Sequence, residues 1–144
     1  MDAGRTLLTT GGLLSLAASV AHLAVIFGGP AWYRFFGAGE RMARSAERGM
    51  IHPTLITIGI ASVLAVWAAY AFSGAGLIGR LPLLRLGLVA ITAVYVVRAF
   101  AYIPLLHFTG QPVGAFAWWS SGIVLVYGLV HVAGLTARWS TLGQ

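Results

Sequence analysis

The sequence predicts an all-α integral membrane protein, built as a four-helix up-down bundle with a short amphipathic interfacial helix between spans one and two. Hydrophobic residues fill 59% of the 144 positions and charged residues only 8%, with a mean hydropathy of +0.89. Soluble domains carry about 25% charged residues, so most of this chain is suited to lipid. Four apolar runs are long enough to cross a hydrocarbon core of about 30 Å, at approximately residues 6–28, 52–73, 83–107 and 116–137.

The connections after the second and third runs are short, at about 73–82 and 109–114. Loops of this length make neighbouring spans adjacent and antiparallel. Four spans leave no room for a second domain, so we expect one transmembrane domain over residues 1–144. The first run stays apolar past Ala21, a plausible cleavage position, as far as Phe27, which favours a span over a signal peptide.

The formal charge of +6 comes from nine basic residues, all of them arginine, against three acidic ones. The arginines are spread over loops and span ends, where anionic lipid headgroups account for them better than nucleic acid does. We therefore expect membrane lipids as partners and no nucleic acid. The absence of lysine, beside abundant alanine, leucine, glycine and valine, is typical of a GC-rich genome and predicts a bacterial inner-membrane protein. With no cysteine, the chain has no disulfide or thiolate metal site.

An even number of spans places both termini on one side of the membrane, and arginine counts set the orientation. Each side receives four arginines, so the counts are tied. The free amino terminus favours cytoplasmic termini, and dual topology is the alternative. The terminal side carries Arg5, Arg80, Arg85 and Arg138, and the other side Arg34, Arg41, Arg44 and Arg48.

The long first connection contains an interfacial segment at about 31–50. It opens with an aromatic cluster around Arg34, of the kind found at headgroup depth. Apolar residues then recur at helical spacing from Met42 to Met50, and Glu40 and Arg44 form an i,i+4 pair. This pattern predicts a short amphipathic helix, lying on the membrane or simply solvated, that ends at Gly49.

Arg98 lies near the middle of the third span, and none of the three acidic residues, Asp2, Glu40 and Glu47, lies inside a span. A charge in hydrocarbon costs roughly 3 kcal/mol on insertion scales, so Arg98 requires compensation. Backbone carbonyls, water, a loop glutamate folded inward or an anionic ligand can provide it. Tyr95 and Tyr102 share the helical face of Arg98, which predicts an inward polar stripe.

Counting from span midpoints places His22, His52, His107 and Arg98 in one half of the membrane, beneath the connection that carries both glutamates. Only His131 falls in the opposite half. We therefore predict one polar pocket centred on Arg98. Its ligand-binding candidates are Arg98, Tyr95, Tyr102, His22, Glu40, Glu47, His52 and His107. The structural alternatives are histidines bonded to helix carbonyls and an arginine that snorkels toward headgroups.

The leading functional hypothesis is a non-enzymatic membrane protein whose pocket binds an anionic group, either a lipid headgroup or a small metabolite. The same polar pocket is also consistent with an accessory subunit of a larger membrane complex. The protein could equally form a homo-oligomer. A haem-binding subunit is a further alternative, although bis-histidine ligation requires two imidazoles at matching depth. A zinc site requires His22, His52, His107 and Glu47 to converge. The sequence identifies no cofactor and no metal.

Two resemblances add to this interpretation. Glu40-Arg41-x-x-Arg44, Ile51-His52-Pro53, Arg98 and Tyr102 together resemble the membrane-associated eicosanoid and glutathione metabolism family of trimeric four-helix enzymes. That resemblance implies a glutathione-dependent or lipid-modifying enzyme, in which Arg41, Arg44 and Arg98 contact glutathione and Tyr102 lies near its thiol. The chain departs from the family pattern on span two and in the arginine–tyrosine spacing of span three.

The second resemblance rests on the stretch Trp32-Tyr33-Arg34-Phe35-Phe36-Gly37-Ala38-Gly39-Glu40. It is similar to uncharacterised small bacterial four-span inner-membrane proteins. This similarity implies a family but no activity.

Overall fold

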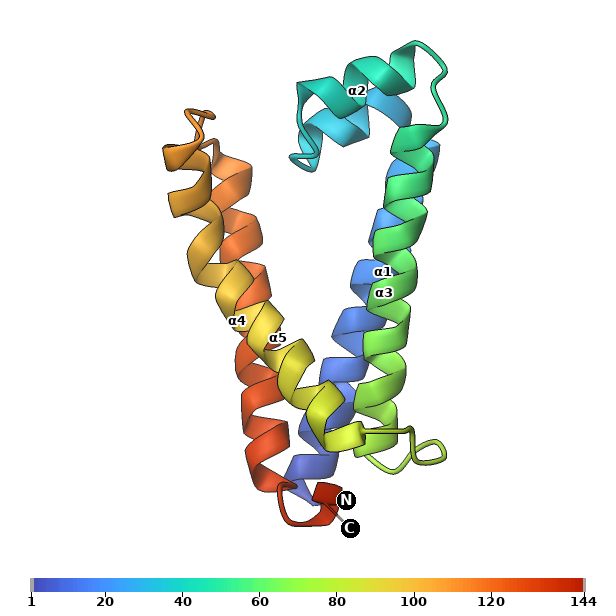
Figure 1. Cartoon of the computed structure of the whole chain (residues 1–144), viewed down its shortest axis with the longest axis vertical. Helices are drawn as coiled ribbons and strands as arrows, with labels where there is room; N and C mark the ends of the chain where they lie inside the picture. Colours follow the sequence, from blue (N-terminus) through green and yellow to red (C-terminus); the bar gives the residue numbers. More distant parts are fainter. Residues whose placement is uncertain (1, 144) are drawn as a thin grey trace. The chain divides into compact units, whose positions relative to one another are not determined.

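A computed structural model describes residues 2–143 of the chain and shows helices joined by turns, with no strand among those residues. Four of the helices are long and apolar enough to cross a membrane. The predicted all-α fold, with a short helix between the first two spans, is confirmed (Figure 1). The elements are α1 (Ala3–Phe35), α2 (Glu40–Glu47), α3 (His52–Gly74), α4 (Leu84–Phe108), α5 (Ala115–Ala137) and the 3₁₀ turn η1 (Thr141–Gly143).

The chain forms two compact units. Unit 1 comprises residues 1–15 and 66–144, and unit 2 comprises residues 16–65. Helices α1 and α3 contribute to both. Unit 1 therefore contains parts of all four long helices, whereas unit 2 is a helical hairpin with α2 at its end.

The core of unit 1 is aliphatic and takes residues from every long helix. Leu8 of α1 is completely buried, and Gly134 of α5 lies so close that an added Cβ would meet Leu8 at 2.9 Å. The absence of a side chain at Gly134 thus lets α1 and α5 approach closely. The buried cluster consists of Leu8, Ala71, Ala75, Leu84, Leu88, Leu135 and Leu142.

Helices α4 and α5 run antiparallel within unit 1, side by side in Figure 1. The ring of Tyr95 meets that of Tyr127, and three residues further along α4, Arg98 reaches back to Ser120 on α5. Along these two contacts the residue numbers increase on α4 and decrease on α5, so the two helices are antiparallel. The turn of 109–114 between the two helices is short, as an antiparallel pair requires.

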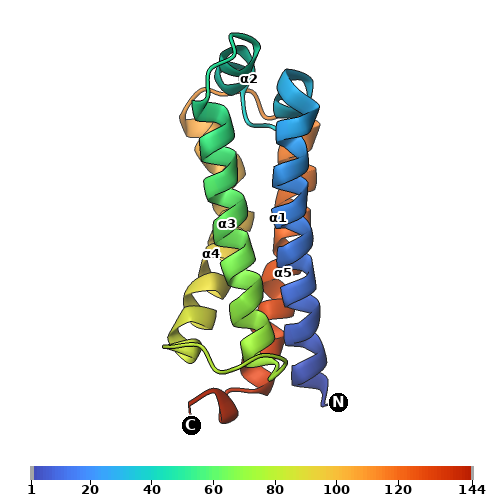
Figure 2. The ribbon, with the colours of Figure 1, turned by 90° about the vertical axis from the view of Figure 1, so that its right-hand side faces the viewer.

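In unit 2, α1 and α3 are also antiparallel, and Figure 2 shows them side by side. Ser19 Oγ donates a hydrogen bond of 2.7 Å to the carbonyl oxygen of Ala61. Nearer the end of the hairpin, the Tyr33 hydroxyl lies 3.2 Å from Thr57 Oγ1. A direct bond from a serine to a neighbouring helix carbonyl requires close backbones, which small residues at the contact permit.

Helix α1 is broken at Gly29, which has φ 64° and ψ −152°. This conformation favours glycine because a Cβ would be strained there. Pro30 follows, and its fixed φ and missing N–H suit the first position of a new helical segment. The span therefore ends at about Gly28, and residues 30–35 form a separate short segment that leads into α2.

Helix α2 packs against the end of α1. Its single fully buried residue, Ala43, contacts Val25 and Tyr33, and Met42 and Ala46 pack around this cluster. Figure 2 shows α2 beyond the ends of the α1–α3 hairpin. The apolar face of this amphipathic helix is thus covered by α1, and its charged face is exposed.

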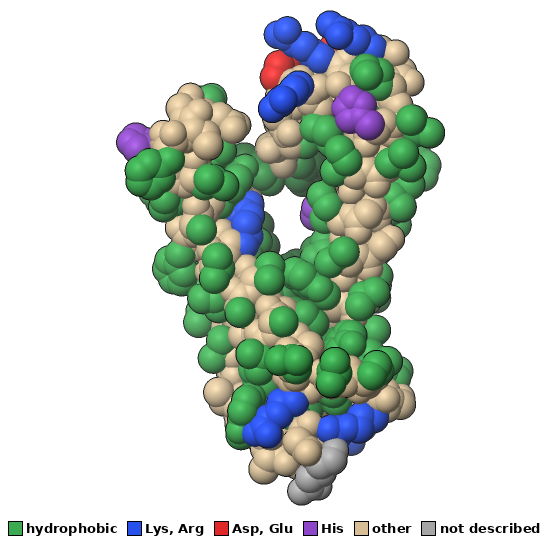
Figure 3. Space-filling model, in the orientation of Figure 1, with side chains coloured by type: hydrophobic (Ala, Val, Ile, Leu, Met, Phe, Trp, Pro, Cys, Tyr) green, Lys and Arg blue, Asp and Glu red, His purple; other side chains and the backbone are tan. Residues whose placement is uncertain are grey.

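The outer surface of the long helices is apolar. In each candidate span, only 28% of the most hydropathic window is buried inside the protein. Figure 3 shows hydrophobic side chains along the helices, arginines gathered over α2, and further arginines at the end of unit 1 opposite the α4–α5 turn. An apolar exterior with charged ends matches a bilayer. The protein is therefore a small polytopic membrane protein.

Candidate functional site

Arg98 lies on α4 and is partly buried. Its guanidinium carbon is 3.7 Å from the ring centroid of Tyr102, one helical turn further on. Contact at this distance is a cation–π interaction, which attracts the charge to the face of the ring. The structure thus brings together two of the predicted site residues.

The hydrogen bonding of Arg98 within unit 1 is sparse. Nη2 donates to Ser120 Oγ over 3.4 Å, which is beyond the usual range for an N–H to oxygen bond. Nη1 is buried and has no hydrogen-bond partner within the described part of this unit. A guanidinium has five N–H donors, so most of the donor capacity of Arg98 is not used by the residues around it.

All three acidic residues of the chain are paired with other arginines. In unit 1, Asp2 accepts the backbone N–H of Arg5 at 2.7 Å, which lowers the pKa of Asp2, and also pairs with Arg138 at 3.1 Å. The two glutamates lie in unit 2. Because each acidic side chain already pairs with an arginine of its own unit, no side-chain carboxylate in the described part of unit 1 neutralises Arg98.

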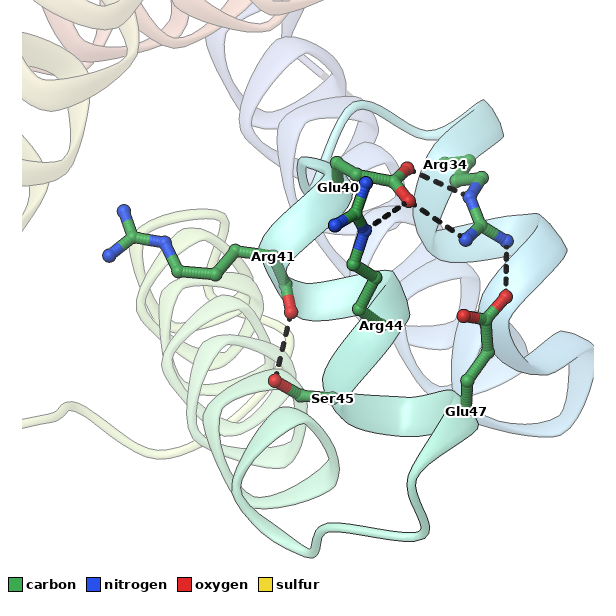
Figure 4. A network of polar contacts seen from close by, with 6 residues as sticks. All are labelled: Arg34, Glu40, Arg41, Arg44, Ser45 and Glu47. Carbon is green, nitrogen blue, oxygen red and sulfur yellow. Dashed lines mark hydrogen bonds and ion pairs between the residues drawn. The ribbon is translucent and has the colours of Figure 1, made fainter.

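Arg34 connects α1 to both ends of α2 (Figure 4). Its Nε and Nη2 donate to the two oxygens of Glu40 at 2.9 and 3.0 Å, and its Nη1 pairs with Glu47 at 2.8 Å. Arg44 adds the predicted i,i+4 pair with Glu40 at 2.9 Å. The hydrogen bonds from Arg34 and Arg44 lower the pKa of Glu40 from 4.5 to about 2. Glu40 therefore stays charged at neutral pH.

Tyr95 has partners other than Arg98. It is 4% exposed, and its hydroxyl lies 2.8 Å from Ser15 Oγ on α1. Its ring packs edge-on against Trp67 and Tyr127, at centroid distances of 5.0 and 5.7 Å. Of the predicted polar stripe, Arg98 and Tyr102 are in contact, and Tyr95 belongs to a separate aromatic cluster one helical turn earlier.

His131 is the polar residue that sequence reasoning left outside the site. It is completely buried in unit 1, 5.1 Å from the Tyr95 ring, and its Nδ1 donates to the Tyr127 carbonyl at 2.8 Å. The neutral ring therefore carries its proton on Nδ1 and a lone pair on Nε2, which has no partner within the described part of unit 1. A nitrogen of this kind can accept a hydrogen bond or ligate a metal. The sequence signal for this buried group is Tyr127, which lies four residues before His131 and therefore on the same face of the helix.

The other predicted histidines occupy simpler positions. His22, in unit 2, is partly buried and bonds through Nδ1 to the Ala18 carbonyl at 2.8 Å, one turn back on its own helix. His52 opens α3 and His107 lies in the last turn of α4, and both are exposed. Unit 1 thus holds Arg98, Tyr95, Tyr102 and His107, and unit 2 holds His22, Glu40, Glu47 and His52.

Metal or haem binding requires ligating side chains that lie close together. No group of three or more His, Cys, Asp or Glu side chains suited to a metal ion occurs in residues 2–143. In unit 1, His131 is 16 residues beyond the start of α5, hence about 24 Å along the helix from the α4–α5 turn where His107 lies. These two imidazoles are too far apart to ligate one haem.

Arg98 also borders a groove on the surface of α4. The groove has a volume of about 280 Å³, and it is lined by Arg98 with Ala93, Val94 and Val97. Val94 and Val97 are 49% and 62% exposed. A molecule with an apolar tail and an anionic end matches a groove in which apolar side chains adjoin a cation.

Comparison with known proteins adds no relative, because the chain matches no protein-family model, no curated protein and no solved structure. The chemistry of the site therefore rests on its own geometry.

Proposed function

We propose that this small membrane protein binds an anionic group at Arg98 and is not itself an enzyme. The observation that carries the proposal is the state of the Arg98 guanidinium. It lies on Tyr102, and its buried Nη1 has no hydrogen-bond partner in the described part of unit 1. The acidic side chain of that unit, Asp2, is paired with Arg138 instead. Charge at this depth is costly and is typically retained for function. A carboxylate or phosphate accepts several guanidinium N–H bonds at once and neutralises the charge.

The apolar groove beside Arg98 favours an amphiphile, either a membrane lipid or a metabolite with an apolar part. The test compares wild type, Arg98→Gln and a control, Arg41→Gln, whose guanidinium points away from the α2 network in Figure 4. Each is purified in neutral detergent, and bound molecules are counted by native mass spectrometry. Dodecyl phosphate and phosphatidylglycerol serve as the amphiphilic probes, and glycerol 3-phosphate as the soluble one.

We expect Arg98→Gln to bind one anionic amphiphile fewer than wild type and Arg41→Gln, at unchanged thermal stability or better. Preference for phosphatidylglycerol indicates a lipid headgroup, and binding of glycerol 3-phosphate indicates a metabolite. Equal counts in all three proteins would refute the proposal.

A glutathione-dependent enzyme is the second candidate, because the Arg98–Tyr102 contact joins two residues that the resemblance assigns to glutathione. This candidate requires a trimer and an ultraviolet difference band of the thiolate when glutathione is added. A monomer or dimer without that band would exclude it.

A haem-binding subunit is the third candidate, supported by the buried lone pair of His131 Nε2. Here reconstitution with haem should yield a Soret band that His131→Ala abolishes. A protein that stays colourless after reconstitution would dismiss this idea.

For the setting, we propose a bacterial inner membrane with cytoplasmic termini. There the protein self-associates or joins a larger membrane complex. We also propose membership of the small bacterial four-span proteins that residues 32–40 resemble. The arginine counts on the two sides are equal, so the orientation depends on a direct test. A fluorescent protein fused to the carboxyl terminus should fluoresce if that terminus is cytoplasmic. A dark fusion at normal expression would reverse the orientation.

A further inference from the structure

We propose a second anion site, at the end of unit 1 where α4 begins, that holds the phosphate headgroup of an anionic membrane lipid. The structure contains a cavity there of about 600 Å³. It is separate from Arg98, which lies more than three helical turns beyond Arg85 on α4. Its lining includes two arginines, one tryptophan and aliphatic side chains: Arg80, Arg85, Trp139, Leu83, Leu86 and Val89.

The cavity is basic, and the residues described along its wall include no acidic one. The sequence of unit 1 contains one acidic residue, Asp2, and the structure pairs it with Arg138. Arg80 and Arg85 are therefore two cations that share a cavity with no acidic side chain among its described lining residues. An anionic ligand supplies the missing counter-charge, and near a membrane each arginine adds about 1 kcal/mol of attraction to anionic lipid.

Arg85 is held in a defined position. Its guanidinium carbon lies 3.6 Å from the centroid of a Trp139 ring. On another side, an added Cβ on Gly143 would meet Arg85 Nη1 at 2.8 Å, so the guanidinium also abuts the backbone of η1. Its Nε is buried and has no partner within the described part of the unit. A planar guanidinium fixed in this way presents its remaining donors as a preformed fork for phosphate oxygens.

Arg80 closes the cavity from the α3–α4 connection. Its Nη2 donates to the carbonyl oxygen of Leu142 at 2.5 Å. This bond uses one of its five donors and orients the side chain along the cavity wall. The first turn of α4 lies on the same wall with no side-chain cap, and its positive dipole end favours an anion as well.

The position of the cavity at the end of a span and the apolar residues at its rim favour a lipid over free phosphate as the ligand. The cavity lies where a span begins, and Trp139 is of the residue type that concentrates at headgroup depth. Leu83 and Leu86, on the rim, are 74% and 62% exposed. An acyl chain covers such side chains, whereas inorganic phosphate leaves them uncovered.

The simpler interpretation is that Arg80 and Arg85 only fasten η1 to the rest of unit 1. The experiment separates the two by measuring phosphatidylglycerol binding to the full chain in neutral detergent, with phosphatidylcholine as the uncharged comparison. All proteins carry Arg98→Gln, so the other proposed site does not contribute, and failure of one proposal leaves the other testable. Arg41→Gln is the control variant, because it removes one arginine of α2 that does not line the cavity.

We expect Arg80→Gln with Arg85→Gln to weaken phosphatidylglycerol binding roughly 30-fold, because each arginine contributes about a fivefold factor. Phosphatidylcholine binding should not change, and Arg41→Gln should bind as its parent does. If the double variant does not fold, Leu86→Glu, which adds a carboxylate at the exposed rim, should weaken binding instead. Unchanged phosphatidylglycerol binding in the variant that folds overturns the proposal, and so does displacement of the lipid by millimolar inorganic phosphate.

Discussion

The hydroxyl of Tyr95 donates a hydrogen bond to Ser15, and this single bond joins α4 to α1 across 80 positions of sequence. Its direction follows from a second bond, in which Ser15 Oγ donates its only proton to the Gly11 carbonyl at 2.9 Å. Tyr95 must therefore be the donor. Both side chains are buried, so neither group has water as an alternative partner.

Because Tyr95 is the donor, removing the Ser15 hydroxyl and removing the Tyr95 hydroxyl should change the free energy of unfolding by different amounts. In Ser15→Ala the Tyr95 hydroxyl remains buried without an acceptor, whereas in Tyr95→Phe the serine keeps its bond to Gly11. We expect Tyr95→Phe to lower the free energy of unfolding by about 0.6 kcal/mol, the average for interhelical bonds in membranes, and Ser15→Ala to cost about 1–3 kcal/mol. Equilibrium unfolding in mixed micelles measures both. A larger loss for Tyr95→Phe would contradict the assigned direction.

Gly11 supports the same cluster through its lack of a side chain. An added Cβ would lie 2.8 Å from Cε1 of the completely buried His131. Gly11→Ala should therefore destabilise the protein by about 1–3 kcal/mol through overpacking. Gly59→Ala is the matched control, because Gly59 is also helical and has nothing within 4 Å of the added Cβ. There the better helix propensity of alanine predicts no loss, and an equal loss at both positions would argue against the contact.

Replacing Arg98 tests whether the protein keeps this charge for function although the charge lowers the free energy of unfolding. Because its donors are largely unused within unit 1, Arg98→Leu should raise the free energy of unfolding, by up to about 3 kcal/mol. The same variant should lose binding of the anionic amphiphile. Unfolding and binding are measured on one preparation. A strong destabilisation would identify Arg98 as a structural latch instead.

The Arg34 network should control the order of α2. Arg34→Ala removes the ion pairs to both Glu40 and Glu47, so we expect faster hydrogen exchange in residues 40–47. Arg41→Ala, on the same helix but pointing away from the network in Figure 4, is the control. If both variants exchange equally fast, packing of Ala43 on Tyr33 rather than the ion pairs orders this helix.

The same network predicts a pH dependence. Because the pKa of Glu40 is lowered from 4.5 to about 2, the stabilisation from its ion pairs is complete above about pH 4.5. It is lost as the pH falls through about 2, since the carboxylate is then protonated. An NMR titration of the Glu40 carboxyl carbon should show this low midpoint, and Arg34→Ala should raise it. A midpoint near 4.5 in the wild type would show that the pairs do not form in solution.

Features that depend on neighbours in sequence could be predicted without the structure. The Glu40–Arg44 pair follows from helical spacing, and the structure confirms it at 2.9 Å. The end of span one near Gly28 follows from Gly29-Pro30, whose conformations do not continue a helix easily. The pairing of Arg34 with both glutamates was missed, because it depends on how the chain turns after that break.

By itself, the sequence determined the lipid solvent, the four spans, the amphipathic α2 and an intramembrane arginine without an acid in any span. These properties follow from hydropathy and from periodicity along one helix. Only the tertiary structure decided that Tyr95 joins Ser15 and His131 rather than Arg98, and that Arg85 stacks on Trp139. The physical reason is that periodicity defines the faces of a helix, whereas the rotation and depth at which two helices pack decide which side chains meet.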